Sequence, residues 1–167
     1  MSKVAFVFAL LFLALGTAPS QTLAQQVSSI EIVDFGIYTA DPQTRRLGQS
    51  GIGTTTVANL KLAASTDRIP MQLGVRFGFQ YRVNGTPADV RVEIRRVDLY
   101  PAPGLTPPGK SKPVRQDEER IVERIGNLTF VGYTLDAPFE MVPGTWTFQL
   151  WIGDRLMAEK SFTLVVP

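Results

Sequence analysis

Five carboxylates in the second half of the chain have the clearest potential for acid–base chemistry. Asp117, Glu118 and Glu119 are consecutive, and Asp136 and Glu140 lie on either side of a proline. A pair of carboxylates can hydrolyse a sugar bond when one acts as the acid and the other as base or nucleophile. The consecutive run is flanked by arginines, which is typical of a solvated charged face, and carboxylates beside a proline commonly bond to turn backbone. We therefore predict that the protein is not an enzyme.

Histidine and cysteine are absent from the whole sequence. Their absence excludes Ser-His-Asp and Cys-His nucleophilic systems and the usual zinc sites. The sequence also has no D-x-D-x-D-G run of the kind that binds calcium. We therefore predict no metal site and no cofactor.

Residues 104–111 match the phosphate-binding pattern G-x-x-x-x-G-K-S at every position. That loop works because converging backbone N–H groups hold the phosphates and a helix begins at the lysine. Pro107 and Pro108 remove two of those donors, and the charged segment that follows has no apolar stripe at helical spacing. We interpret the match as a coincidence of turn residues.

Aromatic and apolar side chains are the remaining candidates for binding. Trp151 and Trp146 are an odd number of positions apart on one predicted strand, so Trp151 points outward if Trp146 points inward. Tyr100 and Leu105 lie at the start of a proline-rich segment, residues 101–113, which is predicted to be a surface loop. Trp151, Tyr100 and Leu105 form the candidate binding surface, because exposed aromatics stack on sugars or anchor protein partners. The alternative for Trp151 is packing against an arginine stem or beneath that loop.

The elements that must position these residues follow an export signal. Residues 4–15 are apolar, come directly after Lys3, and lead to a small residue, Ala24. That order is typical of a secretory signal peptide over residues 1–24, cleaved before Gln25. Because a membrane-spanning helix needs about 20 apolar residues, we predict no stable membrane insertion after cleavage. The predicted location is periplasmic or secreted.

The mature chain, residues 25–167, has the length of a single domain. Cleavage removes Lys3 from the 17 basic side chains, which leaves them nearly balanced by the 15 acidic ones. A surface of this kind argues against nucleic-acid binding, which depends on a basic patch. Without cysteine, the domain depends on packing and hydrogen bonds for its stability.

Alternation of apolar and polar residues with a period of two dominates the mature chain, which predicts half-buried strands. The clearest case is residues 73–83, where Phe77 and Phe79 share the inner face with Leu73, and Arg76 lies on the other face. Asn84-Gly85 follows at once and predicts a tight turn to a partner strand over residues 90–94.

Further strands are predicted along the chain. The strand with Trp146 turns through Gly153-Asp154 into a last strand that carries Phe162. Weaker candidates are residues 30–38, 54–62 and 128–135, and residues 115–125 are read as a strand or a single helical turn. About seven short strands separated by Gly, Pro, Asn and Asp predict an all-β, antiparallel β-sandwich of two sheets.

Four segments of the mature chain resemble one bacterial family: FGIY at 35–38, GVRFGF at 74–79, DAPFEMVPGTW at 136–146 and AEKSF at 158–162. The chain is similar to the family called domain of unknown function 3859 from about residue 30 to its end. This resemblance implies an exported protein of a Gram-negative bacterium with an immunoglobulin-like sandwich. It implies no activity and no functional residues.

Two binding functions are consistent with these features. The first is a non-catalytic interaction module in the bacterial envelope that contacts a protein partner through a sheet face or the proline-rich loop. The alternative is a carbohydrate- or envelope-glycan-binding module that uses Trp151 and neighbouring aromatics. An enzyme that works through carboxylates is the third and weakest reading.

Overall fold

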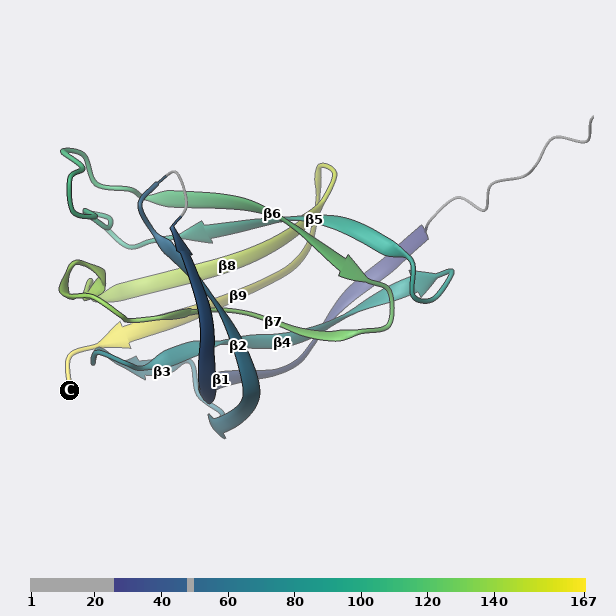
Figure 1. The fold of residues 1–167 in the computed structure, drawn as a ribbon, viewed down its shortest axis with the longest axis horizontal. Coiled ribbons are helices and arrows are strands. Elements are labelled where there is room, and N and C mark those ends of the chain that lie inside the picture. The colour runs from purple at the N-terminus through teal and green to yellow at the C-terminus, as the bar shows by residue number, and fades with distance from the viewer. Residues whose placement is uncertain (1–25, 48–49) are drawn as a thin grey trace, which may run out of the picture.

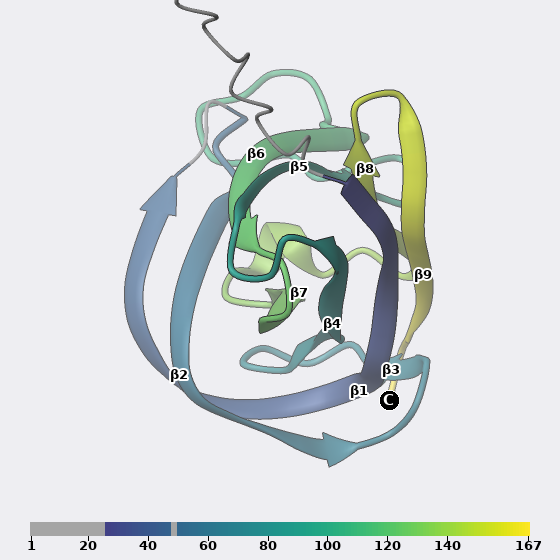
Figure 2. The same cartoon turned by 90° about the vertical axis from the view of Figure 1, so that its right-hand side faces the viewer.

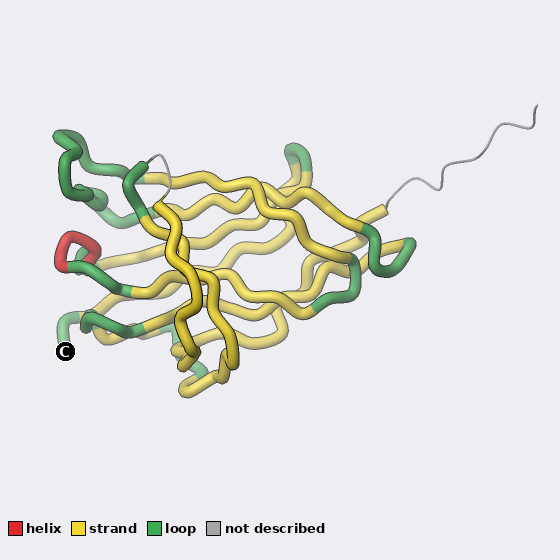
Figure 3. The backbone as a smooth tube through the Cα atoms, viewed as in Figure 1, coloured by secondary structure: helices red, strands yellow, loops and turns green. Residues whose placement is uncertain are grey.

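The computed structural model describes residues 26–47 and 50–167 (Figure 1). The predicted signal peptide, residues 1–24, and its cleavage site lie outside these ranges. Within them, no helix has the length and apolar character needed to cross a bilayer. Figure 3 shows strands and loops nearly throughout, with one short 3-10 helix, η1 (Pro138–Glu140).

The described chain forms nine strands, which group into two sheets. Sheet A has the strand order β2-β1-β4-β7, and sheet B has the order β3-β9-β8-β5-β6. Neighbouring strands are antiparallel, apart from the parallel pair β3 and β9. The predicted all-β sandwich is confirmed. The strands are β1 (Gln26–Leu47), β2 (Gly53–Ala64), β3 (Arg68–Pro70), β4 (Arg76–Thr86), β5 (Arg91–Leu99), β6 (Gln116–Arg124), β7 (Leu128–Thr134), β8 (Gly144–Ile152) and β9 (Arg155–Val165).

The core lies between the inner faces of the two sheets and is rich in aromatic rings. Phe77 and Phe79 of β4 and Trp146 and Phe148 of β8 are all 0% exposed. The Phe77 ring centroid lies 5.8 Å from that of Trp146 and 5.4 Å from that of Phe162 on β9. Because this packing removes large apolar surfaces from water, it supplies a major part of the folding free energy. The predicted inner faces of these strands are confirmed.

A row of glycines crosses sheet A. Gly36, Gly78 and Gly132 are paired in register on β1, β4 and β7. The rings of Tyr38 and Phe130 pack edge to face beside this row, with their centroids 4.9 Å apart. A Cβ atom at Gly132 would lie 2.4 Å from the Phe130 ring. The glycines therefore make room for aromatic packing on the second face of the sheet.

The predicted turn at Asn84-Gly85 is wrong. Both residues lie inside β4, where they pair with Ser29 and Val27 of β1. The long β1 extends the ladder past this dipeptide, and the chain turns at residues 87–90 instead. The expected pairing with the next strand is wrong too, because β4 belongs to sheet A and β5 to sheet B.

Other strand predictions agree with the structure, with two exceptions in side-chain placement. Residues 115–125 contain β6, and the chain turns through Gly153 between β8 and β9. Leu73, predicted to face inward, precedes β4 and is 50% exposed. Arg76, predicted on the face away from the core, is only 8% exposed. Its burial follows from the position of the β1–β2 hairpin.

That hairpin extends beyond the rest of sheet A. β1 pairs with β4 from Gln26 to Tyr38 and with β2 from Ile37 to Leu47. Figure 2 shows the hairpin curving around the outside of β7 toward β6. Since β6 and β7 are edge strands of different sheets, the hairpin lies across one open side of the sandwich. This arrangement creates a cleft.

Candidate functional site

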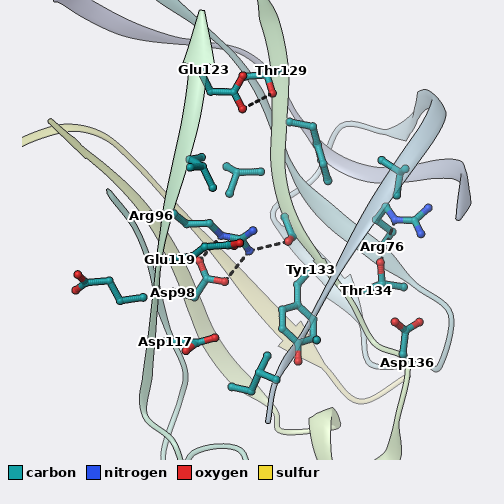
Figure 4. Close-up of a pocket in the computed structure, with 18 residues that line it drawn as sticks. Arg76, Arg96, Asp98, Asp117, Glu119, Glu123, Thr129, Tyr133, Thr134 and Asp136 are labelled. Carbon is teal, nitrogen blue, oxygen red and sulfur yellow. Dashed lines mark hydrogen bonds and ion pairs between the residues drawn. The ribbon is translucent and has the colours of Figure 1, made fainter. Parts of the chain in front are cut away.

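The cleft between β6 and β7, called here the edge cleft, has a volume of about 360 Å³ and is lined by 18 residues (Figure 4). Strands β5, β6 and β7 supply most of the lining. Gly53 and Val57 come from β2, and Ile52 directly precedes that strand. The site therefore combines segments that are far apart in the sequence.

A buried ion pair lines the cleft. Arg96 Nε and Nη2 donate to the two carboxylate oxygens of Asp98 at 2.8 and 2.6 Å, and Nη2 also donates to Gly132 O at 2.9 Å. The Arg96 and Asp98 side chains are 12% and 8% exposed. Burial raises the pKa of Asp98, and pairing with Arg96 opposes that effect. Buried ion pairs seldom stabilise a fold better than apolar residues of similar size would. The Arg96–Asp98 pair therefore indicates a function other than stabilising the fold.

Asp117 of β6 stands directly opposite Asp98 in the β5–β6 ladder, and both residues line the cleft. Like charges at directly opposed positions destabilise a sheet. Arg96 compensates the charge of Asp98, whereas no described residue forms a hydrogen bond or ion pair with the Asp117 carboxylate. The Asp117 carboxylate is therefore repelled by Asp98 and has no counter-ion among the described residues.

Arg76 lies on the other side of β7 from the Arg96–Asp98 pair (Figure 4). Its Nε donates to Thr134 Oγ1 at 3.0 Å, and its Nη1 donates to Ala40 O at 3.3 Å. The carbonyl of Ala40 belongs to the β1–β2 hairpin, which explains why this arginine is buried. Its guanidinium anchors the hairpin to sheet A.

Carboxylates outnumber arginines among the described residues that line the cleft. Two arginines, Arg76 and Arg96, are present against six carboxylates: Asp98, Asp117, Glu118, Glu119, Glu123 and Asp136. The net charge of the described lining residues is therefore negative, which favours a cationic ligand over an anionic one.

Comparison with known proteins identifies the family of this chain. Residues 26–164 match the family described as domain of unknown function, DUF3859. The chain belongs to the DUF3859 family. A comparison with curated proteins finds no match.

The DUF3859 domain is also similar to an immunoglobulin-like protein from Pseudomonas aeruginosa, known from a crystal structure. The two chains share 23% sequence identity with a TM-score of 0.54, over 83% of this chain and 98% of the other. At this level of identity the likeness shows the fold alone. The resemblance inferred from the sequence, to DUF3859 and to an immunoglobulin-like sandwich, is confirmed.

Four of the five candidate carboxylates named from the sequence lie at one cleft of the DUF3859 domain. Asp117, Glu118, Glu119 and Asp136 all line the edge cleft. They come together because β6 ends sheet B beside β7, and Asp136 follows β7 in the chain. No periodicity in the sequence brings these two segments together.

The fifth carboxylate, Glu140, has a structural position and is 1% exposed. It accepts hydrogen bonds from the Tyr133 hydroxyl at 3.0 Å and from the backbone N–H groups of Asp136 and Ala137 at 2.6 and 2.8 Å. Charge-assisted bonds of this kind hold a loop firmly. Glu140 therefore fixes the segment between β7 and η1.

Trp151 lies half-buried on the outer face of sheet B. The Arg95 guanidinium carbon is 4.8 Å from the centroid of its ring, and the indole N–H donates to Gln149 Oε1 at 3.0 Å. Packing against an arginine, the alternative drawn from the sequence, is the arrangement present. A sugar could stack on the covered face of the ring only if Arg95 moved away.

Tyr100 and Leu105 do not lie on a surface, so their assignment to a binding surface is wrong. They are 3% and 0% exposed, and the Tyr100 ring centroid lies 4.9 Å from that of Trp146. Leu105 exchanges two backbone hydrogen bonds with Val114, which hold the start of the proline-rich segment against the core. The matched phosphate-loop pattern ends at Ser111, and strand β6 follows it in place of a helix.

Sequence reasoning missed the Arg96–Asp98 pair, although a signal was present. Val92 and Ile94 were predicted to face inward, and continuing that alternation places Arg96 and Asp98 on the same face. Charged residues at inward positions of a strand are therefore a usable indication of a site in this fold.

Glu123 of the edge cleft provides a pH-dependent prediction. Burial raises its pKa above the ordinary 4.5, and a hydrogen bond from Thr129 Oγ1 at 3.2 Å opposes the rise. The folded state therefore holds this proton more tightly than the unfolded chain, so folding loses stability as the pH rises above 4.5 through the folded pKa. We expect Glu123→Gln to be more stable than the wild type at pH 7 but about equal to it at pH 4, by urea denaturation.

Glu31→Gln, at an exposed position on β1, is the matched control and should give similar stability differences at both pH values. An equal gain for Glu123→Gln at pH 4 and pH 7 would contradict the electrostatic explanation.

Proposed function

We propose that this protein is an exported, non-catalytic interaction module that binds a protein partner in the bacterial envelope through the edge cleft. The observation that carries the proposal is the buried Arg96–Asp98 pair beside the uncompensated Asp117, in a cleft on an open side of the sandwich. Charges held in such a position cost folding free energy, which a binding role would explain.

The backbone of the two edge strands supports a protein as the partner. Among the described residues, β7 pairs only with β4, and β6 pairs only with β5. Gly132 O accepts from Arg96, so Gly132 directs its backbone groups away from β4 and toward the cleft. By the alternation of an antiparallel ladder, Phe130 and Thr134 do the same. An extended protein segment can hydrogen bond to such an edge.

The glycan alternative depends on Trp151, and Arg95 already covers one face of that ring. On the same face of sheet B, Gln149 donates a hydrogen bond to Glu159 Oε2 at 2.6 Å. The contacts of sheet B therefore favour a partner at the cleft over a sugar on this face.

Site-specific photo-crosslinking in living cells tests the proposal. A photoreactive amino acid at Glu119, which is exposed and lines the cleft on the same face of β6 as Asp117, should give a discrete protein adduct after irradiation. The same substitution at Thr163, exposed on β9, serves as the control and should give none. Fractionation of the same cells checks export, since the processed chain should leave the cytoplasm.

Equal adducts from both positions, or none from Glu119, would refute the edge cleft as a partner site. Quenching of tryptophan fluorescence by soluble cell-wall fragments, without a cleft-specific adduct, would favour the glycan alternative instead.

A further inference from the structure

The edge cleft has a charge imbalance that identifies the chemistry of its partner. Asp117 and Asp98 oppose each other on adjacent strands, and Arg96 makes its bidentate contact with Asp98 and a further hydrogen bond to Gly132 O. A second positive charge beside Asp117 would remove the repulsion and add charge-assisted hydrogen bonds. Among the described residues, no side chain supplies that charge to Asp117.

Two buried tyrosine hydroxyls interact electrostatically with carboxylates of the cleft. Tyr81 and Tyr100 are 0% and 3% exposed, and neither hydroxyl has a hydrogen-bond partner within the described residues. Burial is the largest cause of the raised pKa of both tyrosines. The next largest cause is the negative charge of Asp98 for Tyr100 and of Glu123 for Tyr81. Both carboxylates line the cleft, so both hydroxyls are coupled electrostatically to its charged wall. A buried hydroxyl without a partner costs folding free energy, as the opposed carboxylates do.

The shape and donors of the cleft favour an organic cation over a metal ion. The described residues contain no group of three or more carboxylates placed to hold a metal. The lining includes apolar side chains, Ile121 and Val131 among them, which suit the methylene stem of a long cationic side chain. A volume of about 360 Å³ leaves room for such a stem.

We infer that the edge cleft binds an arginine or lysine side chain, presented by an extended segment of the partner, with its charge against Asp117. This inference rests on the proposed function, and it adds the chemistry of the partner. The backbone of that segment lies along the open edge of β7, and the cationic head enters between β6 and β7. Arg96 stays on Asp98 and leaves Asp117 for the incoming charge.

Binding of a labelled hexaarginine peptide to the purified mature protein tests the inference by fluorescence anisotropy. At about 150 mM salt, where charges are screened beyond about 8 Å, we expect saturable binding. Asp117→Asn should weaken it about tenfold, because the substitution removes the charge while keeping the size of the side chain. Asp154→Asn makes the same change of net charge in the exposed β8–β9 turn and should alter affinity less than about twofold.

Absence of saturable binding, an equal loss in both variants, or equal binding of a hexaglutamate peptide would overturn the inference. A stability measurement shows that the key variant is folded. Asp117→Asn removes a like-charge contact, so its urea midpoint should lie at or above that of the wild type. A clear fall in the midpoint would mean that Asp117 stabilises the native fold, which contradicts the inference.

Failure of this inference is distinguishable from failure of the proposed function. If the Glu119 crosslink forms equally in the wild type and in Asp117→Asn, the cleft binds a protein but without a cation on Asp117. If hexaarginine binds in an Asp117-dependent way while no cleft-specific adduct forms in cells, the charge preference stands and the envelope partner is refuted.

Discussion

Trp146→Ala is expected to lower the free energy of unfolding by about 3–5 kcal/mol, enough to threaten folding of a domain without disulfides. Trp146 is 0% exposed, and its ring centroid lies 4.9 Å from those of Tyr100 and Tyr133 and 5.8 Å from that of Phe77. Truncation would leave a cavity where rings from both sheets meet. Urea denaturation followed by far-ultraviolet circular dichroism measures the loss independently of tryptophan fluorescence.

Trp146→Phe is the matched control for this prediction. It keeps an aromatic ring in the core but loses the hydrogen bond from the indole N–H to Val142 O, which measures 3.0 Å. We expect a cost of about 1–2 kcal/mol for the lost bond and the smaller ring. Equal losses for the alanine and phenylalanine variants would mean that the hydrogen bond, and not ring packing, dominates the contribution of Trp146.

Gly78→Ala should be at least as damaging, although it adds a single methyl group. A Cβ atom at Gly78 would lie 2.2 Å from Val131 O and 2.5 Å from the Cα of Gly132, both in the backbone of β7. Because those atoms belong to a paired strand, the clash can be relieved only by separating β4 from β7. We expect a loss of more than about 4 kcal/mol, measured by urea denaturation or as a failure to give soluble protein.

Gly126→Ala separates this steric effect from the general cost of replacing glycine. Gly126 lies in the turn before β7 with a φ of +96°, and a Cβ atom there would meet nothing within 4 Å. The expected cost is about 1–2 kcal/mol, from backbone strain alone. If Gly78→Ala cost no more than Gly126→Ala, the close packing of β4 on β7 would be refuted.

The glycine row also connects the core to the edge cleft. Gly132 contributes its backbone to the row and its carbonyl oxygen to Arg96. Displacing β7 would therefore disturb the cleft as well as sheet A. For this reason Gly78→Ala is unsuitable as a binding test, whereas Asp117→Asn changes the cleft without moving a strand.

The sequence by itself determined which side chains face the core. The period-two pattern placed Phe77, Phe79 and Trp146 on inner faces, because a strand turns alternate side chains to opposite sides wherever it lies. The same rule predicted the β8–β9 hairpin, since Gly153 supplies a local turn between two patterned runs. Local geometry alone decides features of this kind.

Only the tertiary structure decided which strands are neighbours. Asn84-Gly85 carries a strong turn signal, yet β1 pairs alongside it and keeps the chain extended. Tyr100 and Leu105 are buried because the segment that carries them pairs with Val114, which lies further along the chain. Long-range pairing overrode local preference in both cases, since a ladder of hydrogen bonds and buried surface outweighs a turn propensity.

The edge cleft belongs to the same category. Period two fixes the face of Asp98 and of Asp117, but not that β5 and β6 set them opposite each other or that β7 closes the other side. The hairpin that buries Arg76 is likewise invisible in an alternating pattern. Alternation shows on which face of its strand a side chain lies, but it does not show which strand lies next to it. The sequence therefore determined the face of each charged side chain, and the fold determined which charged side chains lie close together.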